Sequence, residues 1–225
     1  MGTPVAIFDM DGTLVDSMYY WDRAPACVLA ARGIIPDDEM EEAFHQLGYE
    51  HIPAYVAERF PALGPPEDFI ARMDRWMLRR YQRDVLVKPN VPEYLSLLRK
   101  KRVRCAILTA SDIRFAEAML RRFQLEPYFE AVFSGRQLGV KKSDPAVYDL
   151  VLASLACAAE NCTLFDDSPY AVQVAAEAGL RTVGILDRWF PHKHEALRQV
   201  CDRTASRYSE LLANDVFSVC AGTGP

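Results

Sequence analysis

The sequence predicts an α/β fold, in which helices flank a parallel β-sheet and a helical domain is inserted near the N-terminus. Three observations support this prediction: the chain opens with a short apolar run, a helix-rich segment follows, and strand-like and helical runs then alternate. Such alternation is typical of parallel sheets, because a crossover helix returns the chain to the same edge. A chain of 225 residues is long enough for one core and one insertion.

The first strand is predicted at residues 5–8, where the run Val-Ala-Ile-Phe is short, apolar and partly β-branched. A continuous apolar run is typical of a strand that is buried on both faces. Asp9, Asp11 and Gly12 follow it directly and predict an acidic turn.

Residues 16–88 are predicted to form the inserted helical domain, since they contain almost no strand-like runs. The clearest helix starts at Pro66, where apolar side chains recur at helical spacing behind an acidic first turn. Residues 1–15 and 89–225 are then expected to form the core. Helices of the insertion are predicted at 19–32, 37–47, 52–60 and 66–84.

The long second part of the core alternates between strands and helices. Strands are predicted at 104–108, 131–133, 162–165 and 182–186. Helices are predicted at 92–101, 112–123, 145–158 and 169–178. The last two start with Asp144-Pro145 and Ser168-Pro169, each an N-cap residue followed by proline. In such sheets, ligands bind at the carboxyl ends of the strands.

Composition excludes several classes of protein. Half of the residues are hydrophobic, which excludes a disordered chain, and the net charge of −5 without a basic cluster argues against a nucleic-acid partner. No apolar window reaches the roughly 18 residues of a membrane span, and Asp9 interrupts the only apolar stretch at the start. Six cysteines without a CxxC pair indicate free, mostly buried thiols. We therefore expect a cytoplasmic monomer or small homo-oligomer without membrane contact.

Charged and hydroxyl side chains follow several of the predicted strands and should meet at one edge of the sheet. They are Asp9, Asp11, Thr109, Lys142, Asp166 and Asp167. Three or four carboxylates this close repel one another, so either a pKa is raised or a cation neutralises them. Hard oxygen ligands in a partly hydrated site favour Mg²⁺.

These residues stand in motifs that resemble those of the haloacid dehalogenase-like (HAD) hydrolases. The run 7–17, Ile-Phe-Asp-Met-Asp-Gly-Thr-Leu-Val-Asp-Ser, is similar to the first motif, Asp-x-Asp-Gly-Thr/Val. Thr109 in Ile-Leu-Thr-Ala-Ser resembles the second, Lys142 in Lys-Ser-Asp-Pro-Ala-Val-Tyr the third, and Asp166-Asp167 in Leu-Phe-Asp-Asp-Ser the fourth. The insertion resembles the helical C1 cap of the β-phosphoglucomutase and phosphoglycolate phosphatase branch. The resemblance implies a Rossmann-like core and hydrolysis of phosphate esters.

The resemblance also implies a role for each motif residue. Asp9 would attack phosphorus and become an aspartyl phosphate, and Asp11 would protonate the leaving alcohol and then take a proton from water. Mg²⁺ would bind the side chains of Asp9 and Asp167 and the backbone carbonyl of Asp11. Its remaining acidic neighbour, Asp166, would bind it directly or through water.

Two further residues of the motifs would hold the phosphoryl group. Thr109 and the amide of Ala110 would bind its oxygens, and Lys142 would offset their charge. Ser143 replaces the first proline of the usual third motif and Lys141 precedes Lys142, so either lysine could be the active one; the spacing to the following Asp-Pro favours Lys142.

Substrate choice is expected to depend on the insertion. Residues 45–51, which include Gly48, resemble the specificity loop of C1 caps, although an ordinary turn between helices explains them equally well. His192 and His194 form a His-x-His pair, but no further cysteine or histidine is spaced to complete a zinc site.

The sequence thus predicts a Mg²⁺-dependent phosphatase for a small phosphorylated metabolite, such as a sugar phosphate or phosphoglycolate. One alternative is a sugar phosphomutase of the β-phosphoglucomutase type; Thr13 favours hydrolysis, because the mutases tend to have valine there. A non-catalytic phospho-acceptor module is a more distant alternative, because its acceptor aspartate follows a middle strand and it lacks a cap.

Overall fold

The computed structural model describes residues 2–47 and 49–217, and the chain divides into two compact units. One unit combines the N-terminal segment to Asp16 with everything from Leu86 onward, and the other is Ser17–Val85. Within the described residues, no helix has both the length and the apolar character needed to cross a membrane.

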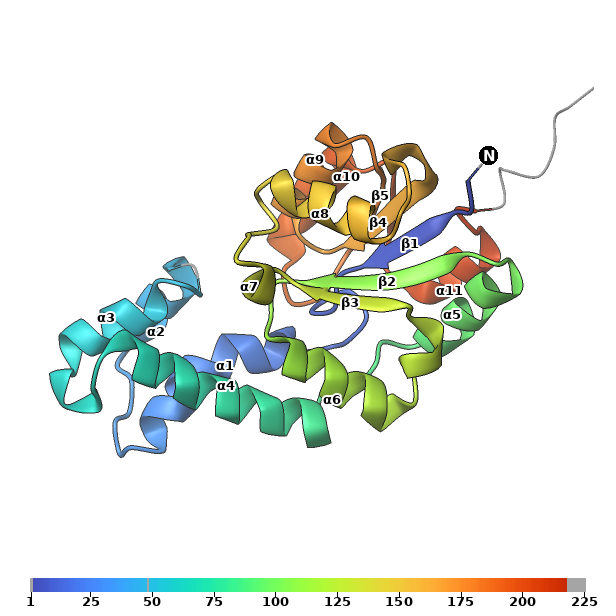
Figure 1. Ribbon diagram of the computed structural model, residues 1–225. Coiled ribbons are helices and arrows are strands. Elements are labelled where there is room, and N and C mark those ends of the chain that lie inside the picture. The colour runs from blue at the N-terminus through green and yellow to red at the C-terminus, as the bar shows by residue number, and fades with distance from the viewer. Residues whose placement is uncertain (1, 48, 218–225) are drawn as a thin grey trace, which may run out of the picture. The chain divides into compact units, whose positions relative to one another are not determined.

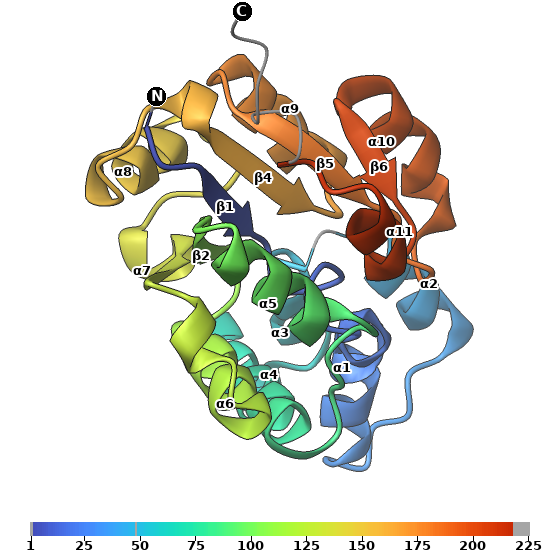
Figure 2. The same ribbon diagram turned by 90° about the vertical axis from the view of Figure 1, so that its right-hand side faces the viewer.

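The larger unit is built on a six-stranded sheet with the order β3-β2-β1-β4-β5-β6, in which every neighbouring pair is parallel. Its strands are β1 (Val5–Phe8), β2 (Arg104–Thr109), β3 (Ala131–Ser134), β4 (Cys162–Asp166), β5 (Arg181–Ile185) and β6 (Arg203–Ala205). Figure 2 shows the arrows of β1 and β4 side by side and pointing the same way. The predicted α/β fold is confirmed.

Helices cover both faces of this sheet. Figure 1 shows α8, α9 and α10 on one side of it and α5, α6 and α11 on the other. The α-helices of this unit are α5 (Val91–Lys100), α6 (Ile113–Phe123), α7 (Gly135–Leu138), α8 (Ala146–Ser154), α9 (Pro169–Glu177), α10 (His194–Val200) and α11 (Tyr208–Ala213). Short 3₁₀ turns lie at η2 (Glu126–Tyr128), η3 (Ala159–Asn161) and η4 (Pro191–Lys193).

The central strands are buried on both faces, as a continuous apolar run requires. Val5 and Ile7 of β1 pack toward α8 in one core cluster. On the opposite face, Phe8 stacks on Phe165 with ring centroids 4.5 Å apart, and Tyr94 of α5 meets the edge of Phe165. Pairing with both neighbours places β1 between β2 and β4, so the residues that follow these three strands share one edge.

The smaller unit is entirely helical in its described residues. It contains α1 (Met18–Ala30), α2 (Asp38–Gln46), α3 (Ile52–Arg59), the 3₁₀ turn η1 (Pro61–Leu63) and α4 (Pro66–Arg83). Phe69, Met73, Met77 and Tyr81 of α4 are all buried, which accounts for the helical spacing of its apolar residues.

Several elements differ from their prediction, and the helices α7, α10 and α11 were not predicted at all. The edge strand β6 is an addition, since its three residues carry no apolar run and become a strand by pairing with β5. Helix α8 ends at Ser154 instead of 158, because the backbone turns left-handed at Ala156, where φ is 48°. Ser168 occupies the N-cap position of α9, but its side chain makes no capping bond.

The cysteines are also less buried than predicted. Cys105 and Cys162 are buried, whereas Cys27, Cys157 and Cys201 are half-buried, and all five are free thiols. The sixth cysteine, at position 220, lies outside the described residues.

Candidate active site

The site begins with the turn that follows β1. The amide of Asp9 donates to the carbonyl of Phe165 at 2.8 Å, which extends the β1–β4 ladder by one residue. Because Phe8 pairs with Phe165, this register places Asp9 beside Asp166 at the carboxyl ends of the two strands. Gly12 then turns the chain with φ at 77°, a left-handed conformation that suits glycine.

Three carboxylates gather at this edge. One oxygen each from Asp9, Asp166 and Asp167 lie within 4.8 Å of one another, and all three residues are buried. Among residues 2–47 and 49–217, this is the one such group of possible metal ligands. The side chain of Asp11 is not part of the cluster.

Lys142 enters the cluster from the loop between α7 and α8. Its Nζ donates to Oδ1 of Asp9 at 2.8 Å and forms a second, shorter bond with Oδ2 of Asp166, and the residue is only 4% exposed. Lys141, the alternative lysine, is exposed. At the end of this loop, Asp144 Oδ1 accepts from the amide of Ala146, at the start of α8.

The charges in this cluster do not balance. Burial opposes the charged form of Lys142, but Asp166 and Asp9 outweigh it and raise the pKa of the ammonium well above its ordinary value. Burial raises the pKa of Asp9 well above its usual range, and Asp166 and Asp167 add to the shift against the attraction of Lys142. Burial likewise raises the pKa of Asp167 to about 7. One buried ammonium therefore faces three carboxyl groups, and a cation would resolve the imbalance.

The oxygens of the cluster fit a bound cation. Oδ2 of Asp9 is buried and has no hydrogen-bond partner, while both oxygens of Asp166 are occupied, one by Lys142 and one by the amide of Ser168 at 2.9 Å. A buried oxygen without a partner is costly unless an ion or water satisfies it. The donor set consists of hard oxygens, as divalent cations of the Mg²⁺ type require.

The second group of site residues lies at the end of β2. Thr109 is completely buried, and its Oγ1 accepts from the amide of Ser111 at 3.0 Å, whereas Ala110 is exposed. Ser111 in turn donates from Oγ to Oδ2 of Asp11 at 2.7 Å. The hydroxyl of Ser134, which lies opposite Thr109 on β3, donates to the carbonyl of Ser111 at 2.7 Å.

Ser111 and Lys193 lie at the site, although the sequence pattern predicts no role for either residue. Ser111 stands within the second motif, but its contact with Asp11 depends on the β1–β2 pairing and not on spacing along the chain. Lys193 places its Nζ 3.8 Å from Oδ2 of Asp167 and carries no motif. Gly48, the predicted substrate contact in the insertion, lies outside the described residues.

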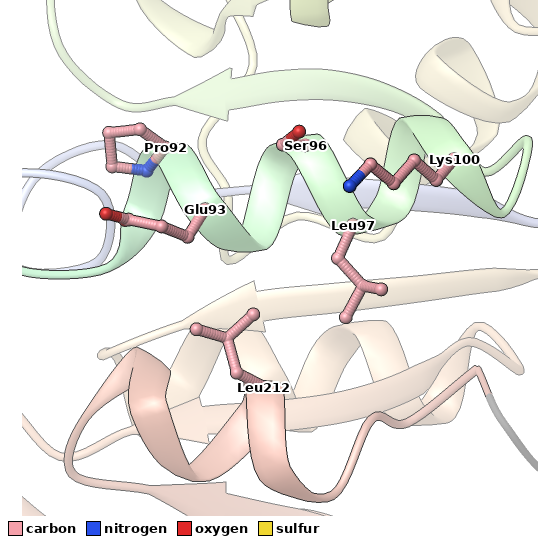
Figure 3. Close-up of a pocket in the computed structure, with 6 residues that line it drawn as sticks. All are labelled: Pro92, Glu93, Ser96, Leu97, Lys100 and Leu212. Atoms are coloured by element: carbon pink, nitrogen blue, oxygen red, sulfur yellow. The ribbon is translucent and has the colours of Figure 1, made fainter.

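The larger unit has pockets both near the cluster and away from it. One of about 340 Å³ lies beside the Ser111–Ser134 contact and is lined by Asp112, Ile113, Arg114, Ser134, Arg136 and Gln137. The other, of about 480 Å³, lies between α5 and α11 (Figure 3) and is lined by Pro92, Glu93, Ser96, Leu97, Lys100 and Leu212. The second pocket contains none of the residues of the cluster.

Comparisons with known proteins identify the relatives of this chain. A family model described as haloacid dehalogenase-like hydrolase matches residues 6–185. A phosphorylated carbohydrates phosphatase of Thermotoga maritima is 29% identical over 177 residues, which cover 79% of this chain and 82% of that protein. Hexitol phosphatase B of Escherichia coli K12 is 28% identical over 225 residues, which cover 96% of this chain and 100% of that protein.

A solved structure shares the fold of the chain. The crystal structure of a putative β-phosphoglucomutase from Thermotoga maritima superposes with a TM-score of 0.76 at 27% identity. The match covers 94% of this chain and 97% of that one, so it includes both the sheet and the inserted helices.

Proposed function

The chain belongs to the haloacid dehalogenase-like hydrolases, and from this premise we propose that it is a Mg²⁺-dependent phosphatase of sugar phosphates. The observation that carries the proposal is the unpartnered Oδ2 of Asp9, buried between Lys142 and two further carboxylates. A buried carboxylate with a free oxygen at a cationic centre is suited to attack an anionic phosphate.

In the proposed reaction, Asp9 attacks phosphorus and carries the phosphoryl group as an aspartyl phosphate, which water then hydrolyses. Asp11 donates a proton to the leaving oxygen and takes one from water, and its hydrogen bond from Ser111 orients the carboxylate for both transfers. Lys142 stays protonated and offsets the charge on the phosphoryl oxygens. The hydroxyl of Thr109 and the amide of Ala110 hold those oxygens.

The proposed cation site uses the side chains of Asp9 and Asp167 and the carbonyl of Asp11. Mg²⁺ bound there would neutralise the negative charge shared by the nucleophile and the phosphate. The oxygens of Asp166 are already occupied by Lys142 and the amide of Ser168, which supports a water-mediated role for this residue.

A sugar phosphate is the favoured substrate, because the two matched phosphatases are named for phosphorylated carbohydrates and for hexitols. Phosphoglycolate is the second candidate. The test is a panel of sugar phosphates, hexitol phosphates and phosphoglycolate, assayed by phosphate release with Mg²⁺ and with EDTA. Release that is equal with and without Mg²⁺, or absent with every ester, would contradict the proposal.

A sugar phosphomutase is the alternative, favoured by the structural match to a putative β-phosphoglucomutase. In that reaction the aspartyl phosphate passes to a sugar instead of water. A sugar monophosphate given with a catalytic amount of its bisphosphate separates the two functions: a phosphatase releases phosphate, whereas a mutase isomerises the sugar with little release.

Residues 45–51 of the insertion are proposed to select the leaving group. Exchange of His45 and His51 for alanine should change the relative kcat/KM among esters of the panel. Equal losses for all of them would assign the segment a structural role only.

The raised carboxyl pKa values predict how stability depends on pH without metal. An aspartate whose pKa rises from about 4 when unfolded to about 7 when folded binds more protons in the native state, so stability falls as pH rises between these values. In EDTA, the thermal midpoint should drop by about 5–10 °C between pH 5 and pH 7.5. Mg²⁺ should restore it, and Asp167→Asn should flatten the profile. A midpoint that stays level or rises over this range in EDTA would refute the charge imbalance.

Loss of the Ser111 hydroxyl predicts a defect in turnover. Ser111→Ala should lower kcat about tenfold with little change in KM, because Asp11 loses a hydrogen bond to its charged form. Ser111→Thr keeps the hydroxyl and should recover most of the rate. If the alanine and threonine variants behave alike, the hydroxyl does not orient Asp11.

A further inference from the structure

Two cysteines meet at the start of β4, at the opposite end of the strand from Asp166. Sγ of Cys157 lies 3.1 Å from Sγ of Cys162, and both are free thiols. Among the described cysteines, this is the one pair whose sulfur atoms touch. The thiol of Cys162 also lies 3.5 Å from the carbonyl of Ala158, within the same loop.

The backbone brings the two side chains together. After α8 the chain turns left-handed at Ala156, and the amide of Cys157 donates to the carbonyl of Leu152 at 3.1 Å. This turn folds the chain back, and the loop then enters β4 at Cys162, whose position is fixed by its pairing with Val5. The contact is therefore held by the helix end on one side and by the sheet on the other.

We propose that Cys157 and Cys162 form a reversible disulfide when the protein meets a hydroperoxide. A disulfide bond is about 2.0 Å long, so the sulfur atoms need to approach by about 1 Å. The inference is independent of the phosphatase reaction, which uses none of these residues.

The two thiols have different roles in this step. Cys157 is half-buried and therefore open to the oxidant, whereas Cys162 is fully buried. Burial raises the pKa of the Cys162 thiol far above its ordinary value, and the Cys157 thiol adds to the shift, so Cys162 stays protonated. The Arg104 guanidinium, anchored by a 2.7 Å bond to the carbonyl of Leu155, lies close enough to both sulfur atoms to interact with them electrostatically.

The chemistry balances with hydrogen peroxide as the oxidant. Cys157 loses its thiol proton as its sulfur attacks one peroxide oxygen and breaks the O–O bond, which gives a sulfenic acid and one water. Sulfur of Cys162 then attacks the sulfenic sulfur, loses its proton and expels the second water. Two thiols give up two electrons and two protons in total, and one peroxide becomes two waters.

Peptide mass spectrometry tests the proposal directly. No lysine or arginine lies between Ser143 and Arg181, so trypsin releases both cysteines, and no other, in one peptide. After titration of the native protein with hydrogen peroxide, this peptide should become about 2 Da lighter, and dithiothreitol should reverse the change. At the same dose of hydrogen peroxide, Cys105 and Cys201 should still be labelled by alkylation.

Three variants control the experiment. Cys157→Ser, at a half-buried position, should abolish the mass loss, as should Cys162→Ala. Cys201→Ser, also at a half-buried position, should behave as the unmodified protein does. The proposal is overturned if the peptide gains oxygen instead of losing hydrogen, if both thiols remain alkylatable when Cys201 is oxidised, or if Cys157 links two chains.

Discussion

Asp9→Asn is expected to lower Mg²⁺-dependent turnover of p-nitrophenyl phosphate at least about a thousandfold, because an amide cannot attack phosphorus to form the aspartyl phosphate. The fold should survive the change. The asparagine oxygen can still accept from Lys142, which keeps its second bond to Asp166. In EDTA near pH 7.5 the thermal midpoint should equal or exceed that of the unmodified protein, since one of three crowded carboxyl groups is gone.

Asp37→Asn is the matched control for this variant. Asp37 caps α2 by accepting from the amide of Met40 at 2.9 Å, and asparagine caps helices equally well. The same chemical change outside the cluster should leave turnover unaltered. Turnover of Asp9→Asn close to that of the unmodified protein, measured with a folded sample, would refute the nucleophile assignment.

Lys142→Met is expected to reduce both turnover and stability. Turnover should fall about a hundredfold or more, because the charge on the phosphoryl oxygens loses its buried counter-ion. The free energy of unfolding in EDTA should fall by about 3 kcal/mol, since Asp9 and Asp166 are left without their cation in a buried site. Mg²⁺ should recover part of the stability. Urea unfolding in EDTA and in Mg²⁺ measures the loss of stability and its recovery, and phosphate release measures turnover.

Lys141→Met separates the two adjacent lysines. The side chain of Lys141 is exposed, so its substitution should change stability by less than about 0.5 kcal/mol and turnover by less than twofold. A loss of turnover in Lys141→Met that matches or exceeds the loss in Lys142→Met would reverse the assignment of the catalytic lysine.

The sequence pattern predicts much of the fold because its signals are local. Apolar runs of strand length and helical spacing such as that of α4 arise from neighbouring residues, and they locate the five longer strands. Edge strand β6 is not predicted in this way because Arg203–Ala205 has no apolar run, and these residues form a strand only by pairing with β5. The end of α8 is not predicted either, since Ala156 adopts φ of 48° without the glycine that usually signals such a turn.

For the site, the sequence by itself determines which chemical groups follow the strands, since Asp9, Thr109, Asp166 and Asp167 each stand at or just beyond a strand end. Parallel strands carry such residues to one edge of any sheet that they form together.

Only the tertiary structure decides how these groups interact. In the folded chain, Lys142 and not Lys141 donates to Asp9, and Ser111 donates to Asp11. Both carboxylate oxygens of Asp166 accept hydrogen bonds, from Lys142 and from the amide of Ser168. These contacts link segments that lie far apart in the chain, so they depend on strand order, on register and on the direction of each side chain. Periodicity in a sequence indicates which face of an element is buried, but it does not give the strand order or the contacts between distant segments, and the burial that raises the carboxyl pKa values follows from these.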